Sequence, residues 1–533
     1  MGLNPAIALC AAWLALCLAP AGDCMAGDAR YTNPVIHADY SDPDALRTDD
    51  GYYMTSSSFS HVPGLPILHS NDLVHWRIVN HAIPRLPPGD HFDRPQHGNG
   101  VWAPSFRRHD GRFYIFYGDP DFGIYVVTAD DPRAEWSEPY LLKPGKGLID
   151  PAPFWDDDGK AYLVHAWAKS RAGFNNVLTL HSMSPDGRSV LDEGKIVVDG
   201  NTIEGWFTIE GPKLYKRDGW YYIFAPAGGV RNGWQGVFRA RSIHGPYEHR
   251  IVLEQGDTEI NGPHQGAWLT TSAGDDWFLH FQDKDTYGRI VHLQPLRWID
   301  GWPVMGADPD GDGTGAPVLE FAAPHPEVGA AGMQPQTSDD FSDGFNLAWQ
   351  WQANPQAGWL GEAPTGSLRL NAVPMPANFW EAGNLLMQKF PAEAFSAQVK
   401  MAFSPAATGD TAGLVVFGYD YNWVGLVRDG EDLLLQQHVR KEARAGGDEA
   451  IVASKPVEGK ALNLRVDVGP GGKCEFSVSK DGIEFKPFGQ PFTARQARWV
   501  GAKVGLFAGS LVEGEGAAAG FAEFGDWRVV IPQ

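Results

Sequence analysis

Apolar and aromatic residues between about positions 42 and 305 recur in short runs separated by Gly and Pro. One arrangement is written five times: a small or acidic residue, a Pro, an apolar run, a Gly turn and an aromatic run. The aromatic runs cover 52–55, 113–116, 161–164, 221–224 and 277–280. Short runs of this kind are typical of β-strands, and we find no amphipathic helical pattern of three turns between them.

The prolines of the five copies set the period of the repeat, which is roughly 50–60 residues. They are Pro43, Pro104, Pro151, Pro212 and Pro263. A period of this size predicts radial repetition of a small sheet, and five copies predict a five-bladed β-propeller, here over 27–318. Pro lacks a ladder donor and is tolerated at the first residue of a strand or at a bulge. We therefore expect the residues beside these prolines to lie where the innermost strands meet the central axis.

The pattern changes after the fifth copy. Residues 319–338 are expected to form a linker, because this part of the chain is rich in Gly, Pro and Ala. Residues 339–533 contain β-like runs without the Pro arrangement, which predicts an antiparallel β-sandwich of a size that folds alone. The fold class is therefore all-β, with a five-bladed propeller followed by a β-sandwich.

An aspartate-rich segment lies before the linker and resembles the start of a calcium loop. Asp308, Asp310 and Asp312 alternate with Pro and Gly, but Leu319 stands where the twelfth position of such a loop would need a bidentate Glu. We interpret the segment as a turn.

The N-terminus predicts export. Residues 6–19 form an apolar run of about 14 residues, too short to span a bilayer and typical of a signal peptide. We expect a signal peptide over 1–26, with cleavage after Ala21 or Ala26, and a periplasmic or extracellular protein without membrane attachment. An uncleaved anchor is the alternative, because no Lys or Arg precedes the run. Cys474 is then the only cysteine of the body, so no disulfide is expected.

The charge balance restricts the partners. The chain has 43 Lys and Arg against 65 Asp and Glu, a formal net charge of −22. This charge repels polyanions and anionic membranes, which argues against nucleic-acid partners, whereas a neutral oligosaccharide or polysaccharide is not repelled. The oligomeric state is not predicted by the sequence.

Three of the axis positions carry acids: Asp42, Asp150 and Glu210. Gathering carboxylates near an axis costs free energy, because each loses hydration and repels the others. A hydrolase that uses two carboxylates explains the cluster, since one protonates a leaving oxygen while the other activates water. The third carboxylate can then tune the pKa of the acid.

The motifs that surround these acids resemble glycoside hydrolase family 43, which contains β-xylosidases, α-L-arabinofuranosidases and arabinanases. The resemblance runs from about Asn33 to Val318, and the C-terminal part resembles the concanavalin-A-like sandwich of β-xylosidase-type members. The resemblance implies a five-bladed propeller and inverting hydrolysis. Its motifs are Tyr40-Ser-Asp-Pro-Asp44, Trp102-Ala-Pro-Ser105, Ile149-Asp-Pro151, Glu210-Gly-Pro212 and Asn261-Gly-Pro-His-Gln-Gly266.

By position, the resemblance implies that Asp42 is the general base, Glu210 the general acid and Asp150 the carboxylate that modulates the acid. Inversion requires a gap for water of roughly 6.5 to 9.5 Å between base and acid. Glu210 stands two places before its Pro, so strict alternation would turn it away from the other two acids unless a bulge or a different strand start re-aims it. The competitors are Asp39 and Asp44 for the base and Glu204 for the acid.

Further residues are expected at the sugar. The resemblance assigns a sugar contact to Arg289 and the bottom of the site to His264, where some members hold a central calcium ion. No cofactor is expected to be required, and a structural calcium ion near His264 remains open. Trp102 and Phe59 are candidates for stacking on apolar sugar faces. Trp206 and Phe207 are expected to border the pocket.

These residues together predict an exo-acting glycoside hydrolase that releases terminal xylose or arabinose from hemicellulose oligosaccharides. Residues 56–65 follow the first aromatic run and are expected to wall one end of the cleft, which favours exo action. The alternatives are an endo-arabinanase, a retaining fructan hydrolase with the same five blades, and a non-catalytic carbohydrate-binding propeller.

Overall fold

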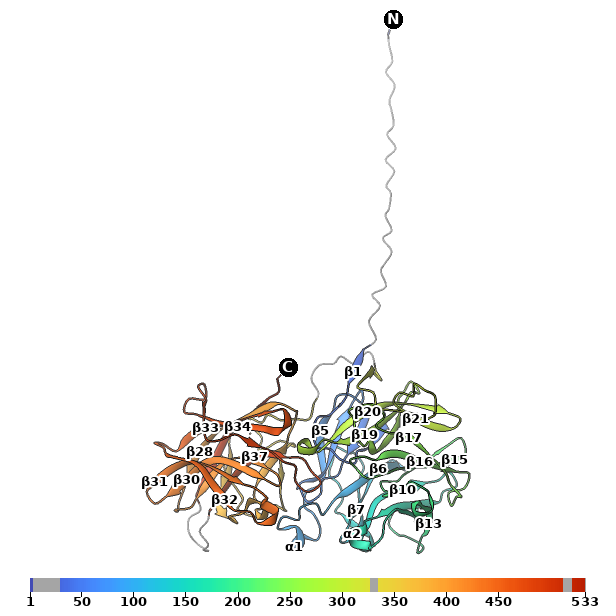
Figure 1. The fold of residues 1–533 in the computed structure, drawn as a ribbon, viewed down its shortest axis with the longest axis horizontal. Helices are drawn as coiled ribbons and strands as arrows, with labels where there is room; N and C mark the ends of the chain where they lie inside the picture. Colours follow the sequence, from blue (N-terminus) through green and yellow to red (C-terminus); the bar gives the residue numbers. More distant parts are fainter. Residues whose placement is uncertain (3–28, 326–333, 511–519, 533) are drawn as a thin grey trace.

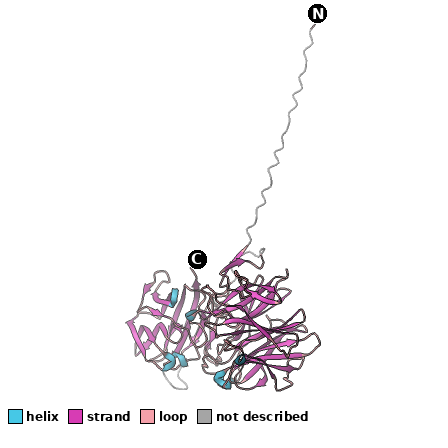
Figure 2. Cartoon of the chain, turned by 45° about the vertical axis from the view of Figure 1, so that its right-hand side comes forward, coloured by secondary structure: helices cyan, strands magenta, loops and turns pink. Residues whose placement is uncertain are grey.

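The computed structural model describes residues 1–2, 29–325, 334–510 and 520–532. The expected signal peptide, apart from its first two residues, lies outside the described residues. The described chain forms two β-rich domains that lie side by side (Figure 1), and strands dominate both of them (Figure 2). The predicted fold class, a five-bladed propeller followed by a β-sandwich, is confirmed.

Each blade of the propeller is a four-stranded sheet whose strands pair in chain order and antiparallel. The first two blades comprise β2 (Asp44–Thr48), β3 (Gly51–Thr55), β4 (Gly64–Ser70), β5 (Arg77–Ile83), then β6 (Trp102–His109), β7 (Arg112–Asp119), β8 (Gly123–Ala129) and β9 (Tyr140–Pro144).

The remaining three blades follow the same order. They comprise β10 (Leu148–Trp155), β11 (Ala161–Trp167), β12 (Val177–Met183), β13 (Lys195–Asp199), then β14 (Lys213–Arg217), β15 (Trp220–Ala227), β16 (Trp234–Ala240), β17 (Glu248–Leu253), and finally β18 (His264–Thr270), β19 (Asp276–Asp283), β20 (Arg289–Ile299) and β21 (Trp302–Met305). The expected aromatic runs are the second strand of each blade.

Apolar side chains between neighbouring blades close the ring. Separate buried clusters join the first blade to the second, the second to the third, the third to the fourth and the fourth to the fifth. A fifth cluster joins the last blade to the first, through Met54 and Leu279 among others. β1 (Arg30–Thr32) pairs with β22 (Glu320–Ala322), which ties the start of the propeller to its end. Radial packing of the blades leaves only short, protected strand edges around the axis.

The C-terminal domain is a sandwich of two larger sheets. One contains β23 (Gln350–Trp351), β27 (Leu386–Lys389), β37 (Lys503–Ser510), β29 (Thr411–Phe417), β30 (Tyr421–Asp429), β31 (Asp432–Arg440) and β32 (Glu449–Pro456), with β26 (Val373–Pro374) beside β37. The other contains β24 (Leu360–Gly361), β25 (Leu368–Asn371), β38 (Phe521–Val530), β28 (Phe395–Ser404), β33 (Ala461–Gly469), β34 (Lys473–Ser479) and β35 (Lys486–Pro487), with β36 (Phe492–Thr493) beside β34.

The facing sheets of the sandwich bury one large apolar core that includes Trp349, Trp351 and Trp527. Cys474 is buried in this core as a free thiol. Helical segments within the described residues are single turns: α1 (Gly89–Phe92), α2 (Lys169–Ala172), η1 (Gly200–Thr202), η2 (Asp285–Tyr287), η3 (Phe379–Glu381), η4 (Ala443–Ala445) and η5 (Pro470–Gly472). Among the residues that the structure describes, no helix is long and apolar enough to cross a membrane.

The sandwich packs on the propeller through backbone and side-chain contacts. Val62 and Trp351 form a β-bridge, and the Asn354 side chain bonds both the amide and the carbonyl of Leu86. The ring of His97 stacks on that of Trp380 with centroids 3.7 Å apart. The contact includes both hydrogen bonds and apolar packing, and it brings a sandwich loop to the propeller axis.

Candidate active site

The backbone at the start of the inner strands has an unusual conformation that all five blades share. Asp42, Ala103, Asp150, Gly211 and Gln265 all have φ between +32° and +58°. A left-handed conformation is rare for residues other than Gly and tends to occur at functional sites. In β6, β10 and β18 it coincides with a β-bulge at Ala103, Asp150 and Gln265.

The fifth blade differs from the sequence expectation at this position. The Pro pattern aligned Gly262-Pro263 with the other copies, but the left-handed, bulged residue is Gln265, and it is Gln265 that lines the cavity described below. Gly262 is also left-handed, and a Cβ there would lie 2.6 Å from the Val230 carbonyl oxygen. Gly262-Pro263 therefore forms a turn, as the repeat predicts, but the residue at the axis position of this blade is Gln265.

The three predicted acids meet in one cavity of about 180 Å³. Asp42, Asp150 and Glu210 line it, together with Phe59, Trp102 and Arg289. The structure thus brings together six of the nine site residues expected from the sequence, whereas His264, Trp206 and Phe207 do not line the cavity. His264 is fully buried and lies against Glu210.

Asp42 is held by two neighbours. Ser57 donates its hydroxyl proton to Asp42 Oδ2 over 2.5 Å and accepts the amide of Ala103 over 2.7 Å. The Nη1 atom of Arg289 lies 3.4 Å from each carboxylate oxygen. Asp42 is 5% exposed, so its orientation is fixed by these contacts while it still faces the cavity.

Asp150 is the most buried of the three acids, with 4% of its surface exposed. Its Oδ2 accepts the amide of Gly211 over 2.7 Å, which fixes the chain directly after Glu210. Burial, followed by the charges of Glu210 and Asp42, raises the pKa of Asp150 well above its ordinary value. Asp150 therefore takes up a proton at a higher pH than an isolated carboxylate would.

Glu210 reaches the cavity because the fourth blade starts late. β14 begins only at Lys213, so Glu210 lies in a non-strand segment and is not bound by the alternation of side chains. The left-handed residues Thr208 and Gly211 flank it, and its amide donates to the Pro226 carbonyl over 3.1 Å. The Glu210 side chain is 24% exposed, and its Oε1 lies 3.1 Å from His264 Nε2. A different strand start, rather than a bulge, re-aims this acid.

The competing acids lie elsewhere. Asp44 is fully buried beneath the cavity, where Arg107 and Lys213 neutralise it. Glu204 is exposed and does not line the cavity. Asp39 is buried but does not line the cavity, because its two oxygens accept backbone amides instead.

Asp39 links the two domains at the edge of the site. Its Oδ1 accepts the amide of Arg289 over 2.9 Å, and its Oδ2 accepts the amide of Gly501, in the sandwich, over 3.1 Å. One buried carboxylate therefore positions both the arginine that faces Asp42 and the loop that carries Trp499.

Trp499 is a sandwich residue that lines the cavity. Its ring makes an edge contact with Trp102, with centroids 6.1 Å apart, and the Arg289 guanidinium lies 5.6 Å from its centroid. Ala497 and Val500 of the same loop pack on Phe59. No local sequence signal could have placed Trp499 here, because the contact depends on how the two domains dock.

Other residues at the rim divide into two groups. Trp167, Asn175 and Val230 line the cavity although the sequence analysis did not single them out. Trp206 and Phe207 do not line it: Trp206 packs on the fourth blade beside Phe238, and Phe207 is 54% exposed.

The segment 56–65 forms part of the wall, as expected. Ser57 holds Asp42, Phe59 lines the cavity and bridges to Val101, and the remainder is almost wholly buried. A cavity of this size, closed on one side by this segment and on another by Trp499, is smaller than the roughly 300 Å³ at which drug-sized sites begin. It suits a single sugar residue.

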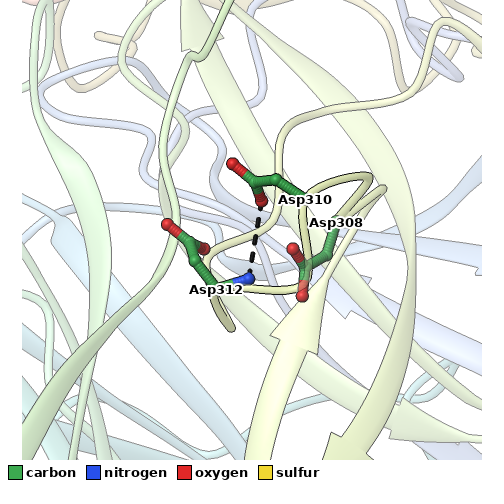
Figure 3. A group of neighbouring side chains, drawn as sticks. All are labelled: Asp308, Asp310 and Asp312. Carbon is green, nitrogen blue, oxygen red and sulfur yellow. Dashed lines mark hydrogen bonds between the residues drawn. The ribbon is translucent and has the colours of Figure 1, made fainter.

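Metal-binding geometry is limited in the described parts of the chain. The one group of three or more close His, Cys, Asp or Glu ligand atoms found there is Asp308, Asp310 and Asp312 (Figure 3), whose ligand atoms lie within 4.8 Å of one another. Their carboxylates accept amides of their own loop at Gly311, Gly313 and Thr314. This is the hydrogen bonding of a turn. His264 belongs to no such group among the described residues.

Comparisons with known proteins agree with this site. Residues 31–303 match the sequence profile of Glycosyl hydrolases family 43, and residues 338–525 match that of the Beta xylosidase C-terminal Concanavalin A-like domain. A putative beta-xylosidase of Xylanibacter ruminicola is 38% identical over 90% of this chain and 86% of its own. A beta-xylosidase of Formosa agariphila is 32% identical over 90% of this chain and 88% of its own.

Solved structures are similar over both domains. A xylan beta-1,4-xylosidase from Bacillus halodurans superposes with a TM-score of 0.81 at 25% identity, covering 93% of this chain and 99% of that one. A family 43 protein from Bacillus licheniformis gives 0.80 at 26% identity, covering 94% and 100%. With three carboxylates in one cavity of a five-bladed ring and both domains matched, this chain belongs to glycoside hydrolase family 43.

Proposed function

We propose that the protein is an exo-acting glycosidase that removes terminal xylose or arabinose from hemicellulose oligosaccharides with inversion. The observation that carries this proposal is the meeting of Asp42, Asp150 and Glu210 in a cavity that suits one sugar residue. The relatives named beta-xylosidase support xylose, and a 27% identical relative from Bacteroides ovatus, named a non-reducing end alpha-L-arabinofuranosidase, keeps arabinose as the second candidate.

The roles of the three acids follow from their surroundings. Asp42, oriented by Ser57 and Arg289, accepts a proton from a water molecule, whose oxygen attacks the anomeric carbon. Glu210, the most exposed of the three, donates a proton to the glycosidic oxygen as the bond to the anomeric carbon breaks. The oxygen of water enters on the face opposite to the leaving group, so the configuration inverts.

Asp150 acts on Glu210 rather than on the sugar. It holds the Gly211 amide and therefore the backbone beside the acid. Its own raised pKa keeps a proton within the cluster at higher pH, and Glu210 is the acid with access to the leaving group.

The exo character rests on the shape of the cavity. Segment 56–65 and Trp499 close it on two sides, which leaves room for the non-reducing end of a chain rather than for a strand passing through. We further propose that the protein is exported and that hydrolysis needs no added cofactor, so that activity persists after treatment with a chelator.

The test is hydrolysis of reduced xylohexaose together with nitrophenyl β-xyloside and nitrophenyl α-L-arabinofuranoside. We expect xylose to appear first, with the chain shortening one residue at a time, and a fall of roughly 10²–10⁴ in kcat for Glu210→Gln and Asp42→Asn. Early products of intermediate length would indicate an endo enzyme. Wild-type turnover no faster than that of the variants would leave only a binding protein, and release of sugar from sucrose-like substrates alone would indicate a fructan hydrolase.

A further inference from the structure

A second concave surface lies at the other end of the propeller axis. The strands that begin at the catalytic cavity run away from it, and residues three to seven positions after the left-handed residue of each blade line a hollow of about 600 Å³. All five blades contribute. We call this surface the basic basin and define it by residues 45–47, 106–109, 153–155, 157, 214–216 and 268–270.

A polar layer separates the basic basin from the catalytic cavity. Lys213 Nζ donates to the Pro104 carbonyl over 2.6 Å and to Ser105 Oγ over 2.8 Å. Asp44 Oδ2 accepts Arg107 Nη1 over 2.7 Å and lies 3.6 Å from Lys213 Nζ. Asp44, Ser105 and Lys213 are fully buried, so the basin is a separate surface and not a rear opening of the catalytic cavity.

Positive charge gathers in the basic basin. Arg47 and Arg108 are exposed, and neither forms an ion pair with any residue that the structure describes. Arg107 pairs with Asp44 through Nη1, while its buried Nη2 has no hydrogen-bond partner. Lys216 adds a fourth cation, paired with Asp156 and Asp157. Asp157, whose side chain is 87% exposed, is the acid that lines the basin, so the positive excess comes from Arg47 and Arg108. The whole chain has a net charge of −22, so a local excess of arginine has the opposite sign to the rest of the protein. Anions are therefore attracted to this surface.

Aromatic rings lie beside these cations. Phe154, Trp155, Tyr215 and Trp268 all line the basin and are partly exposed. The two indoles are fixed in orientation, because Trp155 donates to the Pro185 carbonyl over 2.7 Å and Trp268 donates to Asp276 over 2.9 Å. Rigid aromatic surfaces with an apolar body suit the apolar faces of sugar rings.

We propose that the basic basin is a second, non-catalytic binding site for carbohydrate that carries carboxylate groups, that is, uronic acid residues on a mostly neutral sugar chain. Guanidinium groups bind carboxylates in a bidentate manner, and the rings accept the neutral sugars beside them. A dense polyanion is disfavoured because the field of the whole protein repels it, whereas a sparse carboxylate meets only the local cations. The inference rests on the proposed carbohydrate substrate, and it assigns a charged decoration to that substrate.

The experiment compares two probes on the full chain carrying Glu210→Gln, so that neither probe is consumed. The probes are xylotetraose and xylotetraose that bears one glucuronic acid, titrated by calorimetry. We expect one site for the neutral probe and two for the acidic probe. Adding Arg47→Ala with Arg108→Ala should abolish the second site or weaken it at least about tenfold. The matched charge control, Lys480→Ala with Lys486→Ala on exposed sandwich positions, should leave both sites intact.

Three results overturn the proposal: a single site for both probes, equal losses in the two pairs of variants, or tighter binding of a dense polyanion such as polyuridylate than of the acidic probe. Raising the salt from about 0.02 M to about 0.5 M should weaken the second site selectively, because exposed charge contacts are screened. Turnover of nitrophenyl β-xyloside by Arg47→Ala with Arg108→Ala in the otherwise wild-type chain should be unchanged. That assay reports on the proposed activity alone, so failure of the activity and failure of the basin are distinguishable.

Discussion

The two ends of the propeller axis are built from the same five strands and differ in charge, backbone and cover. At one end the strands begin with left-handed residues, three acids face a cavity of about 180 Å³, and the sandwich supplies Trp499 to its wall. At the other end the strands are regular, arginines and aromatic rings face a hollow of about 600 Å³, and that hollow is lined by propeller residues alone. Strand starts, rather than strand interiors, therefore carry the chemistry that needs precise placement.

The difference has a physical basis in the backbone. A left-handed residue or bulge re-aims a side chain by leaving the regular ladder, and this is how Asp42, Asp150 and Glu210 converge from three blades. The basin needs no such convergence, because a long Arg or Lys side chain on a regular strand reaches across a wide hollow by itself. The following predictions test how far the covered, acidic end depends on the sandwich.

The largest expected effect is a loss of folding stability at acidic pH, caused by buried histidines near the contact between the propeller and the sandwich. Burial lowers the pKa of His81 to about 3 and that of His97 to about 4, and lowers the pKa of His61 well below its ordinary value. Lys389 and Lys503 of the sandwich face this group, and burial lowers their pKa as well. Each imidazole is neutral when folded and takes up a proton readily when unfolded. Its contribution is thus fully present above pH 6.5 and is lost as the pH falls towards the folded pKa.

At pH 5 this linkage amounts to about 2 kcal/mol of unfolding free energy for each such histidine. Urea unfolding at pH 7.5 and pH 5 measures it, and His97→Gln should reduce the difference between the two by about the same amount. His244 is exposed, so His244→Gln serves as the control and should change nothing. A His97→Gln protein with the same pH dependence as the wild type would show that this contact is not the one that titrates.

A smaller effect is expected from Asp39→Asn. The amide would keep one acceptor for the two backbone amides of Arg289 and Gly501 and would remove the negative charge near Lys389 and Lys503. An unsatisfied buried donor costs about 1–3 kcal/mol, so stability should fall by that amount. Because Arg289 and Trp499 both line the cavity, KM should also rise, by about tenfold, with a smaller change in kcat.

The matched control for Asp39→Asn is Asp432→Asn, which alters an exposed acid of the sandwich and should leave both stability and KM unchanged. A loss of stability with an unchanged KM would make Asp39 a purely structural residue and would separate the sandwich from substrate binding.

The sequence predicted the acidic end well, because its signals are local. Asp42 and Asp150 stand directly before the Pro of their copy of the repeat, and the recurrence of that Pro sufficed to predict five blades and the axis. Glu210 stands two places before its Pro, so it does not fit that spacing. The direction of its side chain could not be predicted, because the left-handed conformation of Thr208 does not follow from its residue type. The sequence analysis also missed Gln265, because the nearby Gly262-Pro263 turn matches the repeat and Gln265 does not.

The cover and the basin could not be predicted from local patterns. Trp499 is far from the propeller in the chain and reaches the cavity only through docking of the two domains. Arg47 and Arg108 are ordinary exposed strand residues in the sequence, and their convergence depends on the direction in which each inner strand leaves the axis. Neither the period of the repeat nor the composition of the chain predicts the position of Trp499 or the convergence of the two arginines.

The most direct test of the account is the leaving-group dependence of Glu210→Ala. If Glu210 donates the proton, its loss should reduce kcat/KM strongly for xylobiose, by roughly 10²–10⁴, and far less for nitrophenyl β-xyloside, whose leaving group needs little protonation. Equal losses on the two substrates would contradict the assignment of the acid and, with it, the claim that the covered end of the axis is where the chemistry occurs.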